Sequence, residues 1–449
     1  MHARRSIEEI PRVLSTTDAR HRADAGPIGT GGPLVMVRRR HIAVGGPACA
    51  AFAAFFIAKS APALAAGRGS AVSLEAPEPM ARLHVSDIGA LLGVSASGEL
   101  WQKHGRKWGR LGAGLDPGAP LASGYGRVVG RSREGGLWVL EAGRSVTSRG
   151  LEIADHAGML VLALGVIAVA RAAGGRHHAV RLEPGSAGRW LETARGATTT
   201  LPDAQPVRFD ADGGASDENG QVVILGGPDA ARYRHGVLGD GIEATTLLHL
   251  ERHSLQPLGQ LDLPAPFVFE DVAPRPITWR GRRALLTVRS GPKGGQLAVV
   301  VGTGRGADKL SLAAFSEPLG TIHRWLSPIT DGKQILAVHT PHLGGVLHRY
   351  RDDGHGLVGT AISGDVTNHV IHQRVIDISA WAGGVLVLPT QDRQRLRLFG
   401  AGSGARDFVR GEVHLSSRAE SLHAWARDGV PGVAVLLRDG GVAWAAVTG

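Results

Sequence analysis

The stretch ITDGKQILAVHTPHLGGVL, residues 329–347, decides the fold. It turns at Asp331-Gly332, continues as the apolar run 335–338, and turns again at Gly344-Gly345 before another apolar segment. Short apolar runs separated by glycine turns are typical of antiparallel strands. A helical solenoid would need apolar residues at a 3.6-residue period over more than ten positions, and glycines interrupt the Ala-rich runs that come nearest to this. The stretch therefore predicts a small antiparallel sheet.

The same plan recurs through the C-terminal half of the chain. The turn glycines of the repeats return about every 48 to 50 residues, which is the length of one four-stranded propeller blade. Each unit buries one side of a small sheet, so it must pack on its neighbours around a common axis. The tryptophans at matching positions are expected to pack between blades. The other copies span 277–300, 378–399 and 422–444, and the tryptophans are Trp279, Trp381 and Trp425.

The N-terminal half repeats the plan more loosely. The spacing there is nearer 38 residues, which predicts either shorter blades or blades that lack one strand. Between Gly175 and Gly294 the period stretches and leaves room for about two blades and an insertion around 228–245. We therefore predict an all-β fold in which residues 67–449 form a single β-propeller domain of seven or eight blades.

The repeat unit also resembles a known class. The unit is similar to the FG-GAP and VCBS type of propeller repeat, and more distantly to quinoprotein propellers. Its order is an Asp or Trp, a Gly, four apolar residues, a turn, Gly-Gly and a strand. This resemblance covers residues 80–449 and implies a β-propeller repeat protein. The Asp-rich calcium loop of many FG-GAP blades is missing from most of these repeats, which argues against calcium as an implied ligand.

The first 66 residues read as an export signal. Arg38-Arg39-Arg40 precedes an apolar stretch over 42–57, and Ala63-Leu64-Ala65 follows as an A-x-A cleavage site. The apolar stretch is too short and too rich in Ala and Gly for a membrane span, so no stable span is expected after cleavage. Met36 stands where such a signal would begin, which makes residues 1–35 an extension. The arginines also fit a twin-arginine signal, so export through either the Sec or the Tat route predicts a periplasmic or secreted protein.

Charge and cysteine content exclude several classes of protein. The net charge is +10, but residues 1–66 hold 9 Lys and Arg against 4 Asp and Glu, so 41 basic and 36 acidic residues remain. These are interspersed, as on a solvated surface, and predict no nucleic-acid partner. The single cysteine, Cys49, lies in the signal, so the mature protein would contain no thiolate nucleophile, disulfide or cysteine metal site.

One loop offers oxygen ligands for a metal. Asp210, Asp212 and Asp217 stand on a glycine-rich segment, as hard cations require, but the spacing does not match an EF-hand. Glu218-Asn219-Gly220 before an apolar run also reads as a hairpin turn. We favour the turn and keep the three aspartates as weak metal candidates.

Three other loops mix histidines and carboxylates with glycine. Imidazole and carboxylate groups in one place can serve as general acid and base or as ligands. Loops one blade apart converge on one face of a propeller, so His235, His342 and His369 are expected to meet near the channel. The alternative is that these imidazoles are exposed or structurally bonded. The candidate binding residues in these loops are His235, Asp240, Glu243, His342, His369 and His372.

A Pro-rich connection supplies a further candidate, Arg275. Glu270 and Asp271 precede it, and adjacent residues of an extended strand face opposite sides, so these two are not expected to act as an acid and base pair. An arginine clamp or a surface ion pair is the expectation here. No catalytic signature of a hydrolase, metalloprotease, nucleotide-binding loop or dinucleotide-binding fold appears in suitable context.

Two hypotheses for function follow. The first is an exported, periplasmic binding or assembly protein whose ring presents loops to a protein, a glycan or a small molecule. The alternative is a periplasmic enzyme with an active site at the channel mouth, such as a quinoprotein-like oxidoreductase, using His235, Asp240 and His342. The absence of a catalytic signature favours the first, and neither a catalytic residue nor a cofactor is assigned.

Overall fold

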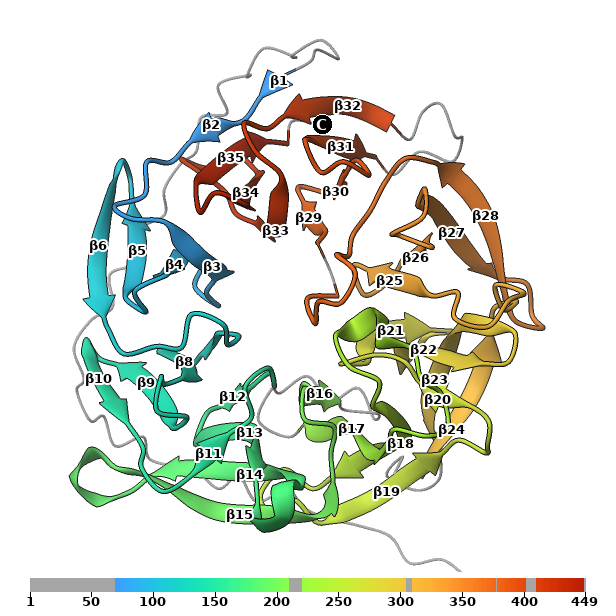
Figure 1. The fold of residues 1–449 in the computed structure, drawn as a ribbon, viewed down its shortest axis with the longest axis horizontal. Helices are drawn as coiled ribbons and strands as arrows, with labels where there is room; N and C mark the ends of the chain where they lie inside the picture. The colour runs from blue at the N-terminus through green and yellow to red at the C-terminus, as the bar shows by residue number, and fades with distance from the viewer. Residues whose placement is uncertain (1–68, 210–219, 304–308, 377, 401–408, 448–449) are drawn as a thin grey trace, which may run out of the picture. The chain divides into compact units, whose positions relative to one another are not determined.

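The computed structural model describes residues 69–209, 220–303, 309–376, 378–400 and 409–447. Contacts divide the chain into the units Met1–Ala61 and Pro62–Gly449, and all the described residues lie in the second. This unit consists of β-sheets that follow one another around a common axis (Figure 1). Among the described residues the only helical segments are three short 3-10 turns, Ala173–Gly175, Ser186–Gly188 and Gly236–Leu238. The all-β prediction is confirmed.

Four sheets are built from strands that follow one another in sequence and pair antiparallel, except that in one of them the first two strands both pair with the third. In each, the first strand lies nearest the axis and the last lies outermost (Figure 1). The first two contain four strands each, so the 38-residue spacing reflects short strands rather than a missing one. The strands are β3 (Met80–Val85), β4 (Leu91–Ser95), β5 (Leu100–His104) and β6 (Lys107–Gly112); β7 (Ala122–Gly124), β8 (Arg127–Arg131), β9 (Leu137–Glu141) and β10 (Arg144–Thr147); β11 (Glu152–Ile153), β12 (Leu160–Leu162), β13 (Gly165–Arg171), β14 (His177–Pro184) and β15 (Trp190–Thr199); β25 (Leu326–Thr330), β26 (Ile335–His339), β27 (Val346–Asp352) and β28 (Leu357–Ser363).

A nine-stranded sheet lies between the third and fourth of these. Two runs of antiparallel strands are linked by β20, which pairs with both β18 and β22. The expected insertion around 228–245 is present as the long connection from β17 to β18. The strands are β16 (Val207–Phe209), β17 (Gln221–Asp229), β18 (Glu243–Leu250), β19 (Pro257–Asp262), β20 (Val268–Phe269), β21 (Arg275–Trp279), β22 (Arg282–Gly291), β23 (Gly294–Thr303) and β24 (Lys309–Phe315).

The two ends of the described chain meet in the last two sheets. Strand β2 pairs antiparallel with β35, Val72 opposite Trp444, and β1 pairs parallel with β32. The N-terminal strand thereby supplies the outer edge that the C-terminal sheet lacks. The strands are β1 (Gly69–Ser70), β2 (Val72–Ser73), β29 (Ala380–Ala382), β30 (Val385–Pro389), β31 (Arg395–Phe399), β32 (Val409–His414), β33 (Ala419–Ala424), β34 (Gly432–Leu437) and β35 (Val442–Ala446).

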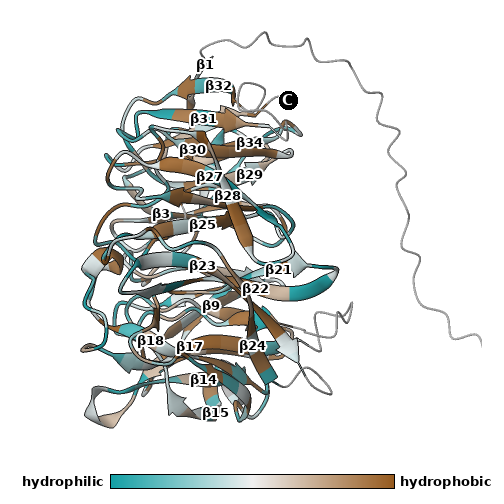
Figure 2. Ribbon diagram, turned by 90° about the vertical axis from the view of Figure 1, so that its right-hand side faces the viewer, coloured by the Kyte–Doolittle hydropathy of each residue, from teal (hydrophilic) through white to brown (hydrophobic). Residues whose placement is uncertain are grey.

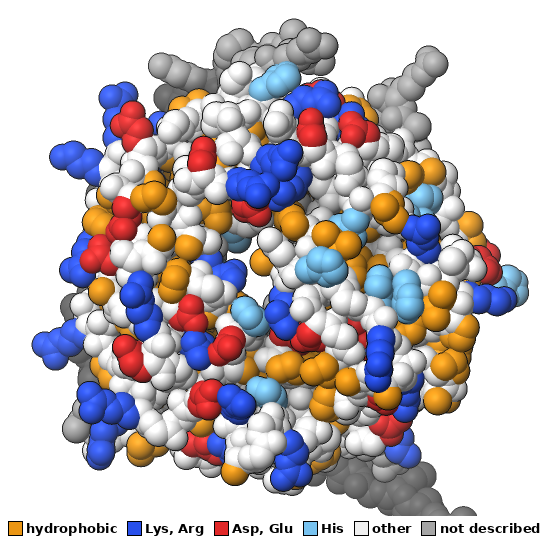
Figure 3. All heavy atoms as spheres, in the orientation of Figure 1, with side chains coloured by type: hydrophobic (Ala, Val, Ile, Leu, Met, Phe, Trp, Pro, Cys, Tyr) orange, Lys and Arg blue, Asp and Glu red, His pale blue; other side chains and the backbone are white. Residues whose placement is uncertain are grey.

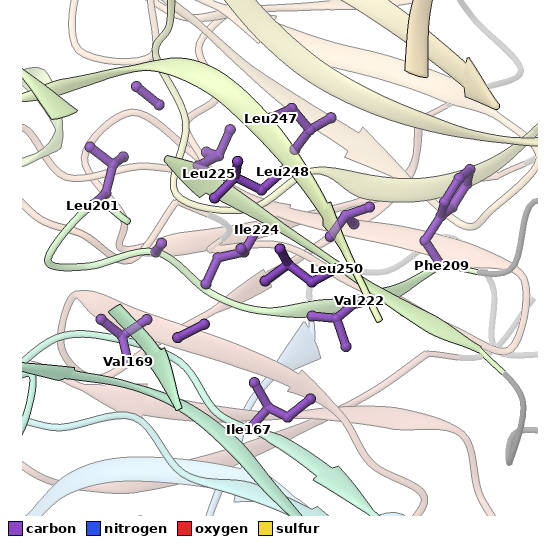
Figure 4. Close-up of a cluster of buried hydrophobic side chains, with 14 of the residues drawn as sticks. Ile167, Val169, Leu201, Phe209, Val222, Ile224, Leu225, Leu247, Leu248 and Leu250 are labelled. Atoms are coloured by element: carbon purple, nitrogen blue, oxygen red, sulfur yellow. The ribbon is translucent and has the colours of Figure 1, made fainter. Parts of the chain in front are cut away.

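The hydrophobic core lies between neighbouring sheets. The second and third strands are the most apolar, and brown segments follow them through the unit in Figure 2. In the largest cluster, Ile167 and Val169 of β13 pack with Ile224 of β17 and Leu247 of β18 (Figure 4). Each sheet therefore buries apolar area only against another sheet, which is the physical reason that the repeats stabilise one another.

The structure explains the recurring glycines. Gly294 and Gly345 each lie at the turn between the second and third strands of a four-strand run and pack on a segment between sheets. A Cβ at Gly345 would lie 2.0 Å from the carbonyl oxygen of Val366, and one at Gly294 would lie 2.4 Å from that of Thr321. No side chain fits at such distances.

The repeated tryptophans also lie where packing was expected. Trp279 is buried in one hydrophobic cluster, and Trp381 and Trp425 pack against two others.

Candidate functional site

The candidate residues all lie at one end of the strands. Neighbouring strands run antiparallel, so the turn from the second to the third strand lies at the same end as the segment that enters the next sheet. The β17–β18 and β26–β27 connections are turns between the second and third strands, and the β28–β29 connection is a segment that enters the next sheet. We call this end of the unit the entry end. Basic, acidic and histidine side chains surround the opening at the centre of the face in Figure 3.

His342 and His369 are in direct contact. His342 Nε2 lies 2.6 Å from His369 Nδ1, and His369 Nε2 lies 2.7 Å from the carbonyl oxygen of Gln373. That carbonyl can only accept, so His369 carries its proton on Nε2 and accepts a bond from His342 at Nδ1. Burial lowers the pKa of His342 to about 4 and that of His369 to about 3, so both rings are neutral at pH 7.

His235 is held by a buried carboxylate. Its Nδ1 lies 2.5 Å from Glu270 Oε1, and Ser290 Oγ donates to Glu270 Oε2. Burial raises the pKa of the Glu270 carboxyl, although the bonds from His235 and Ser290 oppose this. Trp325 connects this pair to the other histidines, because its indole N–H donates to the Glu270 carbonyl and its ring stacks on His342. The three histidines that were predicted to meet are therefore linked by a series of contacts that passes through Trp325.

His372 and Asp240 belong to a neighbouring group. His372 Nδ1 lies 2.7 Å from the Gly236 carbonyl, which joins the β28–β29 connection to the β17–β18 connection. Asp240 Oδ2 accepts from Arg374 at 2.7 Å, and the same guanidinium donates to Asp203 at 3.0 Å. Asp240 is thus an ion-pair partner of Arg374.

Glu243 and Asp203 are buried carboxyls in the same region. Burial, and then the negative charge of Glu270, raises the pKa of Glu243 well above its usual value. Burial and the neighbouring Asp240 raise the pKa of Asp203 to about 6, although Arg374 opposes the shift. Burial and neighbouring carboxylates therefore disfavour the ionised form of both groups.

Arg275, for which the sequence predicted a clamp or a surface ion pair, pairs with Asp271. Its guanidinium lies 3.0 Å from Asp271 Oδ2, and Thr287 donates to the same oxygen at 3.0 Å. Asp271 is 1% exposed, so this ion pair is buried rather than superficial. Glu270 and Asp271 bind different partners, as expected for neighbours on an extended strand.

Three adjoining cavities open at the entry end, and Arg374 and His156 line all of them. Their volumes are 540, 330 and 220 Å³. Arg82, His423 and Arg438 also line the largest.

Several residues of these groups were missed from the sequence. Asp203, Trp325 and Arg374 stand alone among unlike neighbours and match no motif. They share a position, since each lies in a segment that leads into the innermost strand of a sheet. Aligning those segments between repeats would have identified them.

The weak metal candidates Asp210, Asp212 and Asp217 lie outside the described residues. Within the part of the chain that the structure describes, no three His, Cys, Asp or Glu side chains are arranged to hold a metal ion. A search of the same residues for membrane spans found no helix that is long and apolar enough.

The sheets and their arrangement define a β-propeller repeat protein. Among solved structures, Sqt1 of Saccharomyces cerevisiae is similar, with 13% identity, coverage of 85% of this chain and 100% of that chain, and a TM-score of 0.56. The computationally designed protein Ika8 is 12% identical over 85% and 100% of the two chains, with a TM-score of 0.50. BamB from Moraxella catarrhalis is 13% identical over 85% and 99%, with a TM-score of 0.49. No protein-family model and no curated protein sequence matches the chain.

Proposed function

We propose that this chain is an exported β-propeller that binds a partner protein at its entry end, in an assembly or scaffolding role. The observation that carries the proposal is a set of three exposed apolar residues, which we call the apolar tips. Ile322 is 48% exposed, Leu343 64% and Ile371 49%, and each lies on a different connection at this end. Exposed large apolar side chains that gather on one face are typical of protein interfaces.

The apolar tips are carried on anchored backbone. The residue after Ile322 donates its N–H to the Tyr233 hydroxyl at 2.9 Å. The residue before Leu343 bonds His369, and the residue after Ile371 bonds the Gly236 carbonyl. A surface that is already ordered loses little conformational entropy when a partner binds, which increases affinity for a given contact area.

Replacing an apolar tip by aspartate tests the proposal. Partners captured by the tagged chain in its native host are identified and purified, and their affinity for Leu343→Asp is measured by titration. We expect a loss of at least about tenfold, since burying an unpaired charge in an interface is costly. Leu164 is 70% exposed on the turn between β12 and β13, at the opposite end of the strands. Leu164→Asp is therefore the matched control and should bind normally.

Two results would contradict this proposal. Equal affinity of Leu343→Asp and Leu164→Asp for the purified partner would show that the interface lies elsewhere. Sedimentation showing a homodimer that Leu343→Asp dissociates would assign the tips to self-association instead.

Export is the second part of the proposal. The signal-like residues 1–66 support it, together with the absence of any thiol after them. The mature protein in the periplasmic fraction should begin at Ala66 or Gly67, which N-terminal sequencing measures. Dependence on the Tat translocase rather than Sec would identify the twin-arginine route.

We also infer eight blades from the sheet order. The nine-stranded sheet divides at β20 into the runs β16–β19 and β21–β24, which makes one more unit than the seven sheets. An experimental density map would count them directly. Membership of the FG-GAP and VCBS type rests on the repeat pattern alone and stays a prediction.

An enzyme is the second candidate function. It is favoured by His235, because its Nδ1 is bonded to Glu270 in the imidazole–carboxylate arrangement that general acid–base catalysis uses. The absorption spectrum and metal content of the purified protein distinguish the candidates. A bound quinone or a stoichiometric metal would favour the quinoprotein-like alternative.

A further inference from the structure

The cavity of 540 Å³ at the entry end holds cations that have no anionic partner in the described part of the chain. Arg82 on β3 and Arg438 after β34 both line it. The Arg82 Nη2 group donates to the Gly118 carbonyl, and its buried Nε–H makes no hydrogen bond within the described residues. Neither guanidinium forms an ion pair with a described carboxylate. A buried N–H of a cation without an acceptor is costly unless a ligand supplies one.

The other charged groups of this cavity are already compensated. Arg374 binds both Asp203 and Asp240, and Glu420 binds Arg393 at 2.9 Å. Asp116, the carboxylate that acts on Arg82, lies 2.5 Å from Arg131. The positive charge of Arg82 and Arg438 is therefore the uncompensated charge of the lining.

The positive charge affects the pKa of two histidines of the lining. Burial, followed by the nearby His84 and Arg82, lowers the pKa of His423 to about 4. The pKa of His156 is lowered by burial and then by Arg374 and Arg82. Both rings are therefore mainly neutral at pH 7, when their N–H groups can still donate to an anion.

We propose that this cavity binds a small molecule through an oxyanion, either a carboxylate or a phosphate group, which accepts hydrogen bonds from Arg82 and Arg438. A guanidinium presents paired N–H groups that match the geometry of both anions. The volume of 540 Å³ falls within the range of small-molecule sites, which is about 300 to 1,000 Å³. None of the three apolar tips lines this cavity, although His372, which follows Ile371, does, so the anion site is tested separately from the proposed protein partner.

Titration calorimetry of the full chain with inorganic phosphate and with succinate, at constant ionic strength, tests the proposal. We expect saturable binding of at least one anion, weakened about tenfold or more by Arg82→Gln and about threefold by the more exposed Arg438→Gln. Arg106 is exposed and lies outside the cavity lining, so Arg106→Gln is the matched control. Leu343→Asp should bind the anion normally.

The two anions distinguish the ligand chemistry. Saturation by phosphate alone assigns a phosphate ester or free phosphate, and saturation by succinate alone assigns a carboxylate. Failure of both to bind, or equal binding by the wild type and both cavity variants, overturns the proposal. If thermal melting shows that Arg82→Gln does not fold, the Arg438→Gln result decides.

Discussion

Among the described residues, charged side chains have partners on one side of the entry end and lack them on the other. Around β18, β20 and β21, the carboxylates have charged partners: Glu270 with His235, Asp271 with Arg275, and Asp203 and Asp240 with Arg374, which also lines the cavity. On the side of β3 and β34, Arg82 and Arg438 face a cavity without an ion pair. The first arrangement fixes connections to one another, and the second leaves charge available to a ligand.

The largest effect is expected at Glu270. Glu270→Ala leaves His235 and Ser290 without their common acceptor in a fully buried place, so we expect the free energy of unfolding to fall by about 3 to 5 kcal/mol. Urea unfolding measures this. Glu141 is 46% exposed, and its partner Arg127 also donates to the Leu162 and Ala163 carbonyls, so Glu141→Ala should cost less than about 1 kcal/mol. Equal losses in the two variants would show that burial of the Glu270 contacts adds nothing to stability.

Removing Arg374 should have the next largest effect. Arg374→Met leaves Asp203 and Asp240 with only each other's negative charge, and we expect a loss of about 2 to 4 kcal/mol in the free energy of unfolding. Arg171 pairs with Glu152 where both side chains are about half exposed, so Arg171→Met is the control with little expected loss. A stable Arg374→Met protein would mean that these ion pairs do not stabilise the connections.

The pH dependence of stability sharpens the comparison further. The pKa of Asp203 is raised from 3.8 to about 6 in the folded chain, chiefly by burial. Its protonated form is the favoured one, so its stabilising contribution is complete below pH 3.8 and is lost as the pH rises through 6. Between pH 4 and pH 7 the wild type should lose about 2 kcal/mol relative to Asp203→Asn, which cannot ionise. Unfolding of both proteins at the two pH values measures the difference, and parallel curves would contradict it.

The smallest effect on stability is expected at Arg438. Its side chain is exposed at the cavity mouth, so Arg438→Gln should change the free energy of unfolding by less than about 0.5 kcal/mol. The same variant weakens anion binding in the proposal above. A large loss of stability would show that Arg438 stabilises the fold, as the paired charges of the other side do.

The sequence identified the histidines of the entry end but not the residues that they and their neighbours contact. His342 and His369 were predicted to meet because loops at one end of a propeller converge, and the structure brings them within hydrogen-bonding distance. Arg374 and Asp203 were not predicted, because their contact joins residues 171 positions apart and no local pattern marks either one. Arg82 was missed for a related reason. A single arginine in a strand has no distinguishing sequence pattern, and only the structure shows that no described carboxylate pairs with it.

The local pattern of the chain determined the strands, their turns and the need for neighbouring sheets, because apolar alternation and glycine turns act over a few residues. Tertiary structure alone decided which charges are paired and which face a cavity. Pairing depends on side chains brought together from distant repeats, and burial sets the free energy of each charge only after the sheets have packed.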